Sequence, residues 1–239
     1  MKSLKNKVIV ITGGGQGLGK ATAKELSKDG ANVILADIND EAARQSVTEL
    51  TVNGEQLESV HLDVGDAKNV EQVFTDIINK YGTIDILINN AGTDVTKSIT
   101  DLEVAEWDKV LKTNLYGAFH TTKKFFELIG DQGGHIVNIS STAAKGAWEN
   151  AAAYHASKWG LLGFSHAMHV EGRAKNIKVT ALIAGGMKTP FIMDRFPEAE
   201  PNLQDPKNVA ETIRYTLLQP DETVIPEVMV IPINETSWP

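Results

Sequence analysis

Tyr154 and Lys158 stand four residues apart, a spacing that places both side chains on one face of a helix. A phenol whose ordinary pKa is about 10 is a poor base near neutrality. A nearby ammonium group favours the phenolate and lowers that pKa. Such a pair could accept a proton from an alcohol or donate one to a carbonyl oxygen. The spacing also occurs by chance on helix surfaces, so it needs support from the rest of the chain.

Two other polar positions could serve the same chemistry. Ser140 and Ser141 follow the apolar run His135–Ile139, and a hydroxyl there could hydrogen-bond the substrate oxygen. A helix cap or a serine turn is the alternative. Asn114 falls within a helical stretch, where asparagine is unfavourable. It either has a function there or is tolerated at a kink.

The segment Thr12–Gly19 reads TGGGQGLG and joins a predicted strand to a predicted helix. Glycine lets the backbone turn tightly and approach a ligand closely. The N-terminus of the following helix offers free N–H groups to a pyrophosphate. A tight turn without a ligand is the alternative, but the strand–loop–helix context favours a dinucleotide-binding loop.

Asp37 ends the next predicted strand, 18 residues after Gly19. An acid at this distance can accept hydrogen bonds from the adenosine ribose hydroxyls. Its charge repels a 2′-phosphate, and no Lys or Arg lies within Gly13–Gly19 to neutralise one. The residue after the acid, Ile38, is also uncharged. These residues favour NAD as the cofactor over NADP.

Seven short runs rich in Val and Ile recur along the chain with little polar alternation, which is typical of strands buried on both faces of a parallel sheet. Amphipathic stretches of helical length lie between most of them. The alternation predicts one α/β domain over residues 1–239, a doubly wound Rossmann sheet of about seven parallel strands with helices on both faces. The runs are Lys7–Thr12, Asn32–Ala36, Leu57–Leu62, Ile84–Asn89, His135–Ile139, Lys178–Ile183 and Val224–Ile231.

The composition excludes several classes of protein. Of 239 residues, 42% are hydrophobic and 23% charged, as in ordinary globular domains. A net charge of -8 disfavours a nucleic-acid partner and gives no reason to bind an anionic membrane. The absence of cysteine excludes disulfides and thiolate metal sites. No run approaches the roughly 20 apolar residues of a membrane helix. We therefore expect a cytoplasmic protein with no metal site.

Taken together, the motifs resemble the short-chain dehydrogenase/reductase family over nearly the whole chain. They occur in family order: T-G-x-x-x-G-x-G at Thr12–Gly19, the acid Asp37, Asp63-Val64, N-N-A-G at Asn89–Gly92, Asn114, Ser141, and Y-x-x-x-K at Tyr154–Lys158. The resemblance implies an NAD(H)-dependent oxidoreductase that interconverts a secondary alcohol and a ketone. It is similar to the 3-oxoacyl reductase and 3-hydroxy-acid dehydrogenase branches, which suggests small-molecule substrates of those types.

The resemblance also assigns roles. It implies Asn114, Ser141, Tyr154 and Lys158 as catalytic residues, with Ser141 preferred to Ser140. Lys158 would bond the nicotinamide ribose, and Asn114 would anchor a water in a proton relay to Lys158. The implied cofactor contacts are Gly13, Gln16, Gly17, Leu18, Gly19, Asp37, Ile38, Asp63, Val64, Asn90, Ala91, Gly92, Tyr154, Lys158, Ala184, Gly185, Met187 and Thr189.

Three segments depart from the family pattern or resist assignment. Ala184 stands where the family usually has proline, which loosens a rigid turn, although Thr189 keeps its place. The proline-rich segment 188–206 is either a lid over an apolar substrate or a loop packed on the core, and we take it as the candidate substrate loop. Its cations, Lys188 and Arg195, suit a substrate with an apolar body and an anionic end. The tail Thr236–Pro239 also differs from the family pattern, so the sequence does not predict which subunit contacts it makes.

Two residues near Tyr154 receive weaker expectations. His155 should point away from Tyr154 on the helix and serve the structure. Trp148, six residues before Tyr154, could line the substrate side of the cleft.

The resemblance implies a homo-oligomer, a dimer or a homotetramer, that pairs the helices around Glu103–Leu128 and Ala153–Ala174. Three alternatives to the NAD(H)-dependent oxidoreductase remain. One is a non-catalytic NAD-binding sensor or interaction protein on the same fold. Another is an NADP-dependent 3-oxoacyl-thioester reductase. The third is an enzyme that uses the nicotinamide for a transient redox step, as in epimerisation or dehydration.

Overall fold

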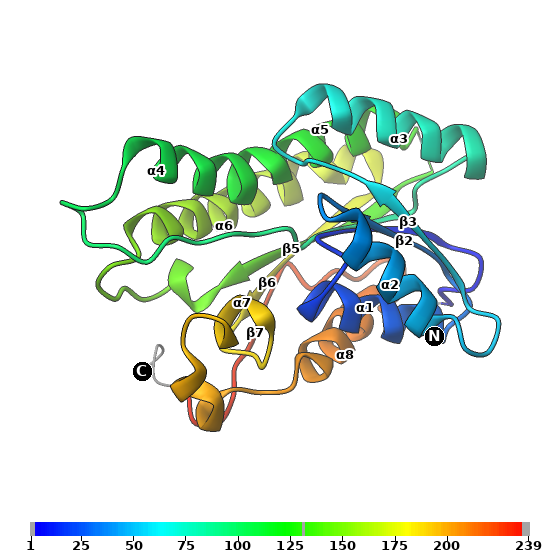
Figure 1. Ribbon diagram of the computed structural model, residues 1–239. Coiled ribbons are helices and arrows are strands. Elements are labelled where there is room, and N and C mark those ends of the chain that lie inside the picture. The colour runs from blue at the N-terminus through cyan, green and yellow to red at the C-terminus, as the bar shows by residue number, and fades with distance from the viewer. Residues whose placement is uncertain (1–2, 131, 236–239) are drawn as a thin grey trace.

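Seven strands form one sheet in the order β3-β2-β1-β4-β5-β6-β7, and every neighbouring pair is parallel. The computed structural model describes residues 3–130 and 132–235. Figure 1 shows helices on both faces of this sheet. The strands are β1 (Val8–Thr12), β2 (Asn32–Asp37), β3 (Gln56–His61), β4 (Ile86–Asn89), β5 (Gly134–Ser141), β6 (Ile177–Ala184) and β7 (Glu227–Val230).

The helices cover the sheet in two layers. α1, α2 and α8 pack on one face, and α3, α5 and α6 on the other, with α4 against α6 (Figure 1). The α-helices are α1 (Gly17–Ser27), α2 (Asp40–Leu50), α3 (Ala67–Tyr81), α4 (Val104–Leu111), α5 (Gly117–Leu128), α6 (Ala152–Gly172), α7 (Pro190–Met193) and α8 (Pro206–Leu217). Shorter segments are the π-helical η1 (Lys112–Tyr116) and the 3₁₀ turns η2 (Thr142–Ala144), η3 (Arg173–Lys175) and η4 (Pro197–Asn202).

The alternating direction of strand side chains explains why β1 carries apolar residues toward both faces of the sheet. In β1, Ile9 and Ile11 join the core under α1 and α8, whereas Val8 and Val10 join the core under α3 and α5. Both cores need apolar side chains, so every position of the strand is buried.

The predicted fold class is confirmed, and all seven predicted strands are present. Several strand ends differ from the predicted runs by one or two residues, and two regions differ more. The run Val224–Ile231 forms a strand only over Glu227–Val230, because Pro226 has no N–H for the ladder. The helical region Glu103–Leu128 is broken at Asn114 by the π-helical segment.

The strand order reverses beside β1, whose neighbours are β2 and β4. In an open parallel sheet, ligands bind at such a switch point, outside the carboxyl ends of the strands. The loops that follow β1 to β6 converge there. Within the described residues, no helix is both long and apolar enough to cross a membrane. The tail Thr236–Pro239 lies outside the described residues.

Candidate active site

A cleft of about 820 Å³ opens at the carboxyl ends of the strands. It gathers most of the residues that the sequence predicted for the site. Those that line it are Gly13, Gln16, Gly17, Leu18, Asp37, Ile38, Asp63, Val64, Asn90, Ala91, Gly92, Ser141, Tyr154, Lys158, Ala184, Gly185, Met187 and Thr189. Two predicted residues, Gly19 and Asn114, lie behind this lining rather than in it.

The Tyr–Lys pair lies on α6 as predicted, and the end of β5 supplies a serine beside it. The Nζ atom of Lys158 is 5.6 Å from the centre of the Tyr154 ring. The Ser141 side chain hydrogen-bonds the Tyr154 phenol. Lys158 Nζ also donates to the carbonyl of Ile139 at 2.8 Å, which anchors it to β5. The structure therefore brings Ser141, Tyr154 and Lys158 together in one cleft.

The protonation of this cluster differs from the sequence-based expectation. Burial, with a smaller contribution from the nearby Asp94 carboxylate, raises the pKa of Tyr154 to about 12, although the Ser141 hydrogen bond and Arg195 act to lower it. Burial lowers the pKa of Lys158 to about 8. The sequence predicted a lowered phenol pKa, and the pKa is raised instead, because burial disfavours the charged phenolate. At neutral pH the phenol keeps its proton and can donate it.

Asn114 occupies the π-helical segment between α4 and α5 and is 1% exposed. Its Nδ2 donates to the Thr93 carbonyl at 2.9 Å and to Ser157 Oγ at 3.0 Å. Its Oδ1 accepts from the Thr93 N–H at 2.8 Å. A Cβ on Gly92 would lie 3.6 Å from Asn114 Oδ1 and 3.9 Å from Lys158 Nζ. Asn114 thus ties α6 to the loop after β4, close behind Lys158.

The glycine-rich loop is held tightly against β4. Gly13 has a φ of +63°, and a Cβ there would lie 2.9 Å from the Cα of Ala91. A Cβ on Gly19 would lie 2.1 Å from the Gly13 carbonyl, so Gly19 is needed for packing behind the loop. Asn90 Nδ2 donates to the carbonyls of Thr12 and Gly13 at 3.0 and 2.9 Å. Asn90 therefore shapes the loop as well as lining the cleft.

The N-terminus of α1 meets the requirement of a phosphate site. Its N-cap residue, Gln16, makes no side-chain capping hydrogen bond. By contrast, Asn39 caps α2 through a hydrogen bond from the Ala42 N–H. The first N–H groups of α1 are therefore left for a ligand in the cleft, where the positive end of the helix dipole favours an anion. This arrangement fits the pyrophosphate of a dinucleotide.

Asp37 is fixed at the wall of the cleft beside the glycine-rich loop. Its Oδ2 accepts from the Gly15 N–H at 2.8 Å, and its Oδ1 from the Asn39 N–H at 2.9 Å. The described lining residues that follow it, Ile38 and Asn39, carry no charge. The negative charge of Asp37 is thus placed as the sequence predicted.

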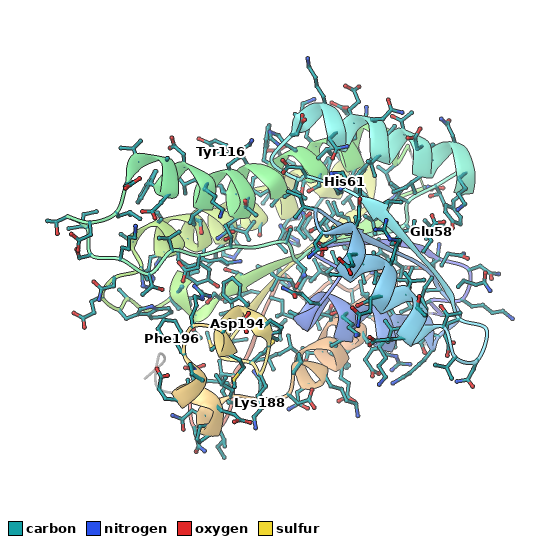
Figure 2. All side chains as sticks on the ribbon, viewed as in Figure 1. Glu58, His61, Tyr116, Lys188, Asp194 and Phe196 are labelled. Atoms are coloured by element: carbon teal, nitrogen blue, oxygen red, sulfur yellow. The ribbon has the colours of Figure 1, made fainter. Side chains whose placement is uncertain are left out.

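The segment 188–206 contributes one wall of the cleft. It contains α7 and η4, and Pro190, Phe191, Ile192 and Phe196 line the cavity. The Phe191 ring lies 6.0 Å from that of Tyr154. Figure 2 shows Lys188, Asp194 and Phe196 on this side of the molecule, away from Tyr116 on the helical layer. The contact with Tyr154 supports the substrate-loop prediction.

The sequence analysis named Arg195 as a cation of the segment 188–206, but it did not identify Asp94 as the partner of Arg195 in the cleft. Asp94 follows the N-N-A-G motif by two positions, and its Oδ2 accepts from Arg195 Nη1 at 2.7 Å. Its position at the carboxyl end of β4 was the available signal, but no spacing indicated its partner 101 residues away.

His155 has a more specific role than the sequence indicated. Its Nε2 accepts from the Trp148 N–H at 3.1 Å, so its Nδ1 carries the hydrogen that is donated to the Ala143 carbonyl at 2.9 Å. The Trp148 ring lies 4.4 Å from the imidazole. Trp148 lines the cleft, so His155 holds a substrate-side residue in place from the helix that carries Tyr154.

Replacing His155 by alanine is expected to raise KM for the carbonyl substrate by about tenfold, because two hydrogen bonds that fix the loop are lost. The value of kcat should change little, since His155 contacts neither Ser141 nor Lys158. Steady-state kinetics measure both. His166→Ala, which removes an exposed imidazole paired with Glu227, is the control. A fall in kcat at constant KM would contradict the positioning role.

No cluster of three His, Asp or Glu side chains suited to a metal ion occurs in the described ranges. His166 pairs with Glu227 at 2.9 Å, and His169 pairs with Arg173 at 3.3 Å. Both histidines therefore have protein partners.

Comparison with known proteins places these features in a family. Residues 7–200 match the family model for short chain dehydrogenase. The uncharacterized oxidoreductase YxbG of Bacillus subtilis (strain 168) is 36% identical over 193 residues, which cover 80% of this chain and 71% of that protein.

Solved structures agree with the sequence comparison. Levodione reductase superposes with a TM-score of 0.89 at 27% identity, covering 95% of this chain and 97% of that one. Actinorhodin polyketide ketoreductase with NADPH gives a TM-score of 0.88 at 27% identity, covering 98% of this chain and 100% of that one. The chain therefore belongs to the short-chain dehydrogenase family and is an oxidoreductase that acts on CH–OH groups with a nicotinamide cofactor.

Proposed function

We propose that this protein is an NAD(H)-dependent oxidoreductase that interconverts a ketone and a secondary alcohol, with Tyr154 as the acid and base. The observation that carries the proposal is the cluster of Ser141, Tyr154 and Lys158 in the same cleft as the glycine-rich loop. A cofactor whose pyrophosphate lies at the start of α1 would extend toward this cluster along the carboxyl ends of the strands.

The residues can divide the reduction between them. Ser141 and the Tyr154 phenol are placed to hydrogen-bond one carbonyl oxygen, since they already bond each other. The nicotinamide, when bound, supplies the hydride to the carbonyl carbon. Tyr154 donates its proton to the oxygen, which completes the alcohol. The Lys158 ammonium stabilises the phenolate that is left behind. A proton from solvent then restores the phenol. Oxidation of the alcohol runs through the same groups in reverse.

Further roles follow from the same placement. Asn114 Oδ1 and Lys158 Nζ would both lie within 3.9 Å of a Cβ on Gly92, and this proximity supports a proton relay through a water held by Asn114. Thr189 is 6% exposed and lies beside the glycine-rich loop, 3.3 Å from a Cβ on Gly17. This position supports a contact with the nicotinamide carboxamide. Ala184 continues β6 and pairs with Val230, so the strand keeps its end without the family's proline.

The preference for NAD rests on Asp37. Its carboxylate is held by two backbone N–H groups and stands beside uncharged residues. A 2′-phosphate placed there would meet a negative charge with no compensating cation. A ketoreductase of the same fold has been solved with NADPH. The proposed preference for NAD therefore depends on Asp37 and not on the fold. An NADP-dependent 3-oxoacyl-thioester reductase is the alternative.

Several copies of the chain are expected to assemble into a dimer or a homotetramer. Tyr116 in the π-helical segment, Phe119 on α5 and Trp159 on α6 are 53%, 45% and 53% exposed. Leu162 of α6 is 5% exposed and packs in the core, so it is not part of this surface. The exposed aromatic residues support pairing through α5 and α6.

The proposal is tested by following nicotinamide absorbance while the purified protein meets a panel of ketones, oxoacyl thioesters and cyclic diketones with NADH or NADPH. We expect turnover with NADH, and slower turnover with NADPH. Cofactor binding without turnover across the panel would favour the non-catalytic sensor. Faster turnover with NADPH would favour the oxoacyl-thioester reductase.

A further inference from the structure

Among the described residues that line the cleft, Lys109, Lys158 and Arg195 are cationic. Only Arg195 comes from the segment 188–206, and Asp94 neutralises it. Arg195 Nη1 donates to Asp94 Oδ2 at 2.7 Å, and the Asp94 side chain is only 9% exposed. The Arg195 guanidinium also lies 4.3 Å from the Phe191 ring centre and donates to the Phe191 carbonyl. Arg195 is thus held on both sides and does not reach freely toward a ligand.

The second cation of the same segment is paired as well. Lys188 lies 3.4 Å from Glu200, and these side chains are 47% and 56% exposed. Lys188 is absent from the lining of the cleft. The anionic substrate end that the sequence suggested therefore finds no unpaired cation among Lys188 and Arg195.

Acidic side chains add to this effect. Asp94 is close enough to Tyr154 and Lys158 to raise the pKa of both groups. Glu149 places another carboxylate in the lining, on the loop that also carries Trp148. A carboxylate next to the reacting carbonyl would meet these negative charges in a partly desolvated cleft, which is unfavourable.

The remaining walls suit an uncharged substrate. Trp148, Phe191, Ile192 and Phe196 surround the space near Tyr154 with apolar surface. One oxygen of Asp94, Oδ1, is buried and makes no hydrogen bond within the described parts of the chain. The carboxylate is thus committed to Arg195 through a single oxygen.

We propose that Asp94 determines specificity by neutralising Arg195, so that the cleft accepts uncharged ketones with an apolar body and rejects oxoacid anions. This inference rests on the proposed carbonyl reduction. It names the substrate class of that reaction. Removing the Asp94 charge should allow the cleft to bind a carboxylate, because the Arg195 guanidinium is then unpaired and can bind the carboxylate itself.

Methyl benzoylformate and benzoylformate test this proposal, because they share the phenyl ring and ketone and differ in the charge of the carboxyl end. Calorimetry measures the binding of each to the protein saturated with oxidised cofactor, where no reduction occurs. We expect wild type to bind the ester at least tenfold more tightly. Asp94→Asn should lower this ratio at least tenfold, and Arg195→Gln should raise it. Glu200→Gln, which frees the exposed Lys188, should leave it unchanged.

The outcomes separate the two proposals. Equal binding of ester and acid by wild type, binding of neither, or an unchanged ratio in both Asp94→Asn and Arg195→Gln would overturn the role of Asp94. The same ligands are then offered with reduced cofactor. If the binding ratios are as expected but neither these two ligands nor the wider ketone panel is reduced, the role of Asp94 stands and the proposed function is rejected.

Discussion

Replacing Tyr154 by phenylalanine is expected to lower kcat/KM for ketone reduction by about 10²- to 10⁴-fold, the usual contribution of a positioned acid or base. The substitution removes one hydroxyl and keeps the ring that packs near Phe191. Binding of the cofactor should stay close to wild type, because the glycine-rich loop and Asp37 lie on other elements. The effect should therefore fall on the chemical step.

The pH dependence of the reaction rates should also reflect the role of Tyr154 as acid and base. With a pKa of about 12, Tyr154 is protonated at neutral pH and serves reduction directly as the proton donor. Alcohol oxidation needs the phenolate, whose fraction rises tenfold for each pH unit below that pKa. We therefore expect the oxidation rate of wild type to increase with pH from neutrality upward. Tyr154→Phe should lose this increase together with its activity.

Steady-state kinetics in both directions and cofactor titrations measure these effects. Tyr215→Phe is the matched control, since it removes the hydroxyl of a tyrosine that is 60% exposed on α8. It should behave as wild type. Full activity of Tyr154→Phe would refute the acid–base assignment, whereas equal losses in both variants would point to a general effect of the substitution.

The fold and much of the site could be predicted because they depend on local patterns. The run Val8–Ile11 is apolar at every position, as expected for a strand that is buried on both faces of the sheet. The glycines of Thr12–Gly19 are required because the backbone makes close contacts there, such as that between Gly19 and Gly13. The motif order then placed Ser141, Tyr154 and Lys158, and the structure brings them into one cleft.

What the sequence could not supply depends on distant partners and on burial. The pKa of Tyr154 moves upward because its surroundings are desolvated, which spacing alone does not reveal. Asp94 and Arg195 are 101 positions apart and meet only after the segment 188–206 folds over the cleft. The cations of that segment suggested an anionic substrate until their partners were known. Charges near a site therefore indicate a ligand only after internal pairs are accounted for.

Replacing Asp37 by asparagine is expected to shift the ratio of NADH to NADPH efficiency toward NADPH by about 10- to 100-fold. Asparagine is nearly the same size, and its single oxygen can still accept from a backbone N–H, as Asp37 does from Gly15. The change thus removes the charge more than the shape. Repulsion between two charges about 4 Å apart amounts to some 1 to 4 kcal/mol between water and the protein surface, which matches the expected shift.

Fluorescence titration of both cofactors and their kcat/KM values measure this ratio. Asp40→Asn provides the control, because Asp40 lies three residues further on, pairs with His61 at 3.1 Å and does not line the cleft. Asp40→Asn removes the same charge as Asp37→Asn. It should leave the NADH/NADPH ratio unchanged, because the position of the charge and not the net charge determines cofactor choice. Wild-type protein that binds NADPH more tightly than NADH would contradict the role of Asp37. A wild-type preference for NADH that survives in Asp37→Asn would instead locate the discrimination in the shape of the pocket around Ile38, whose side chain is 64% exposed beside it.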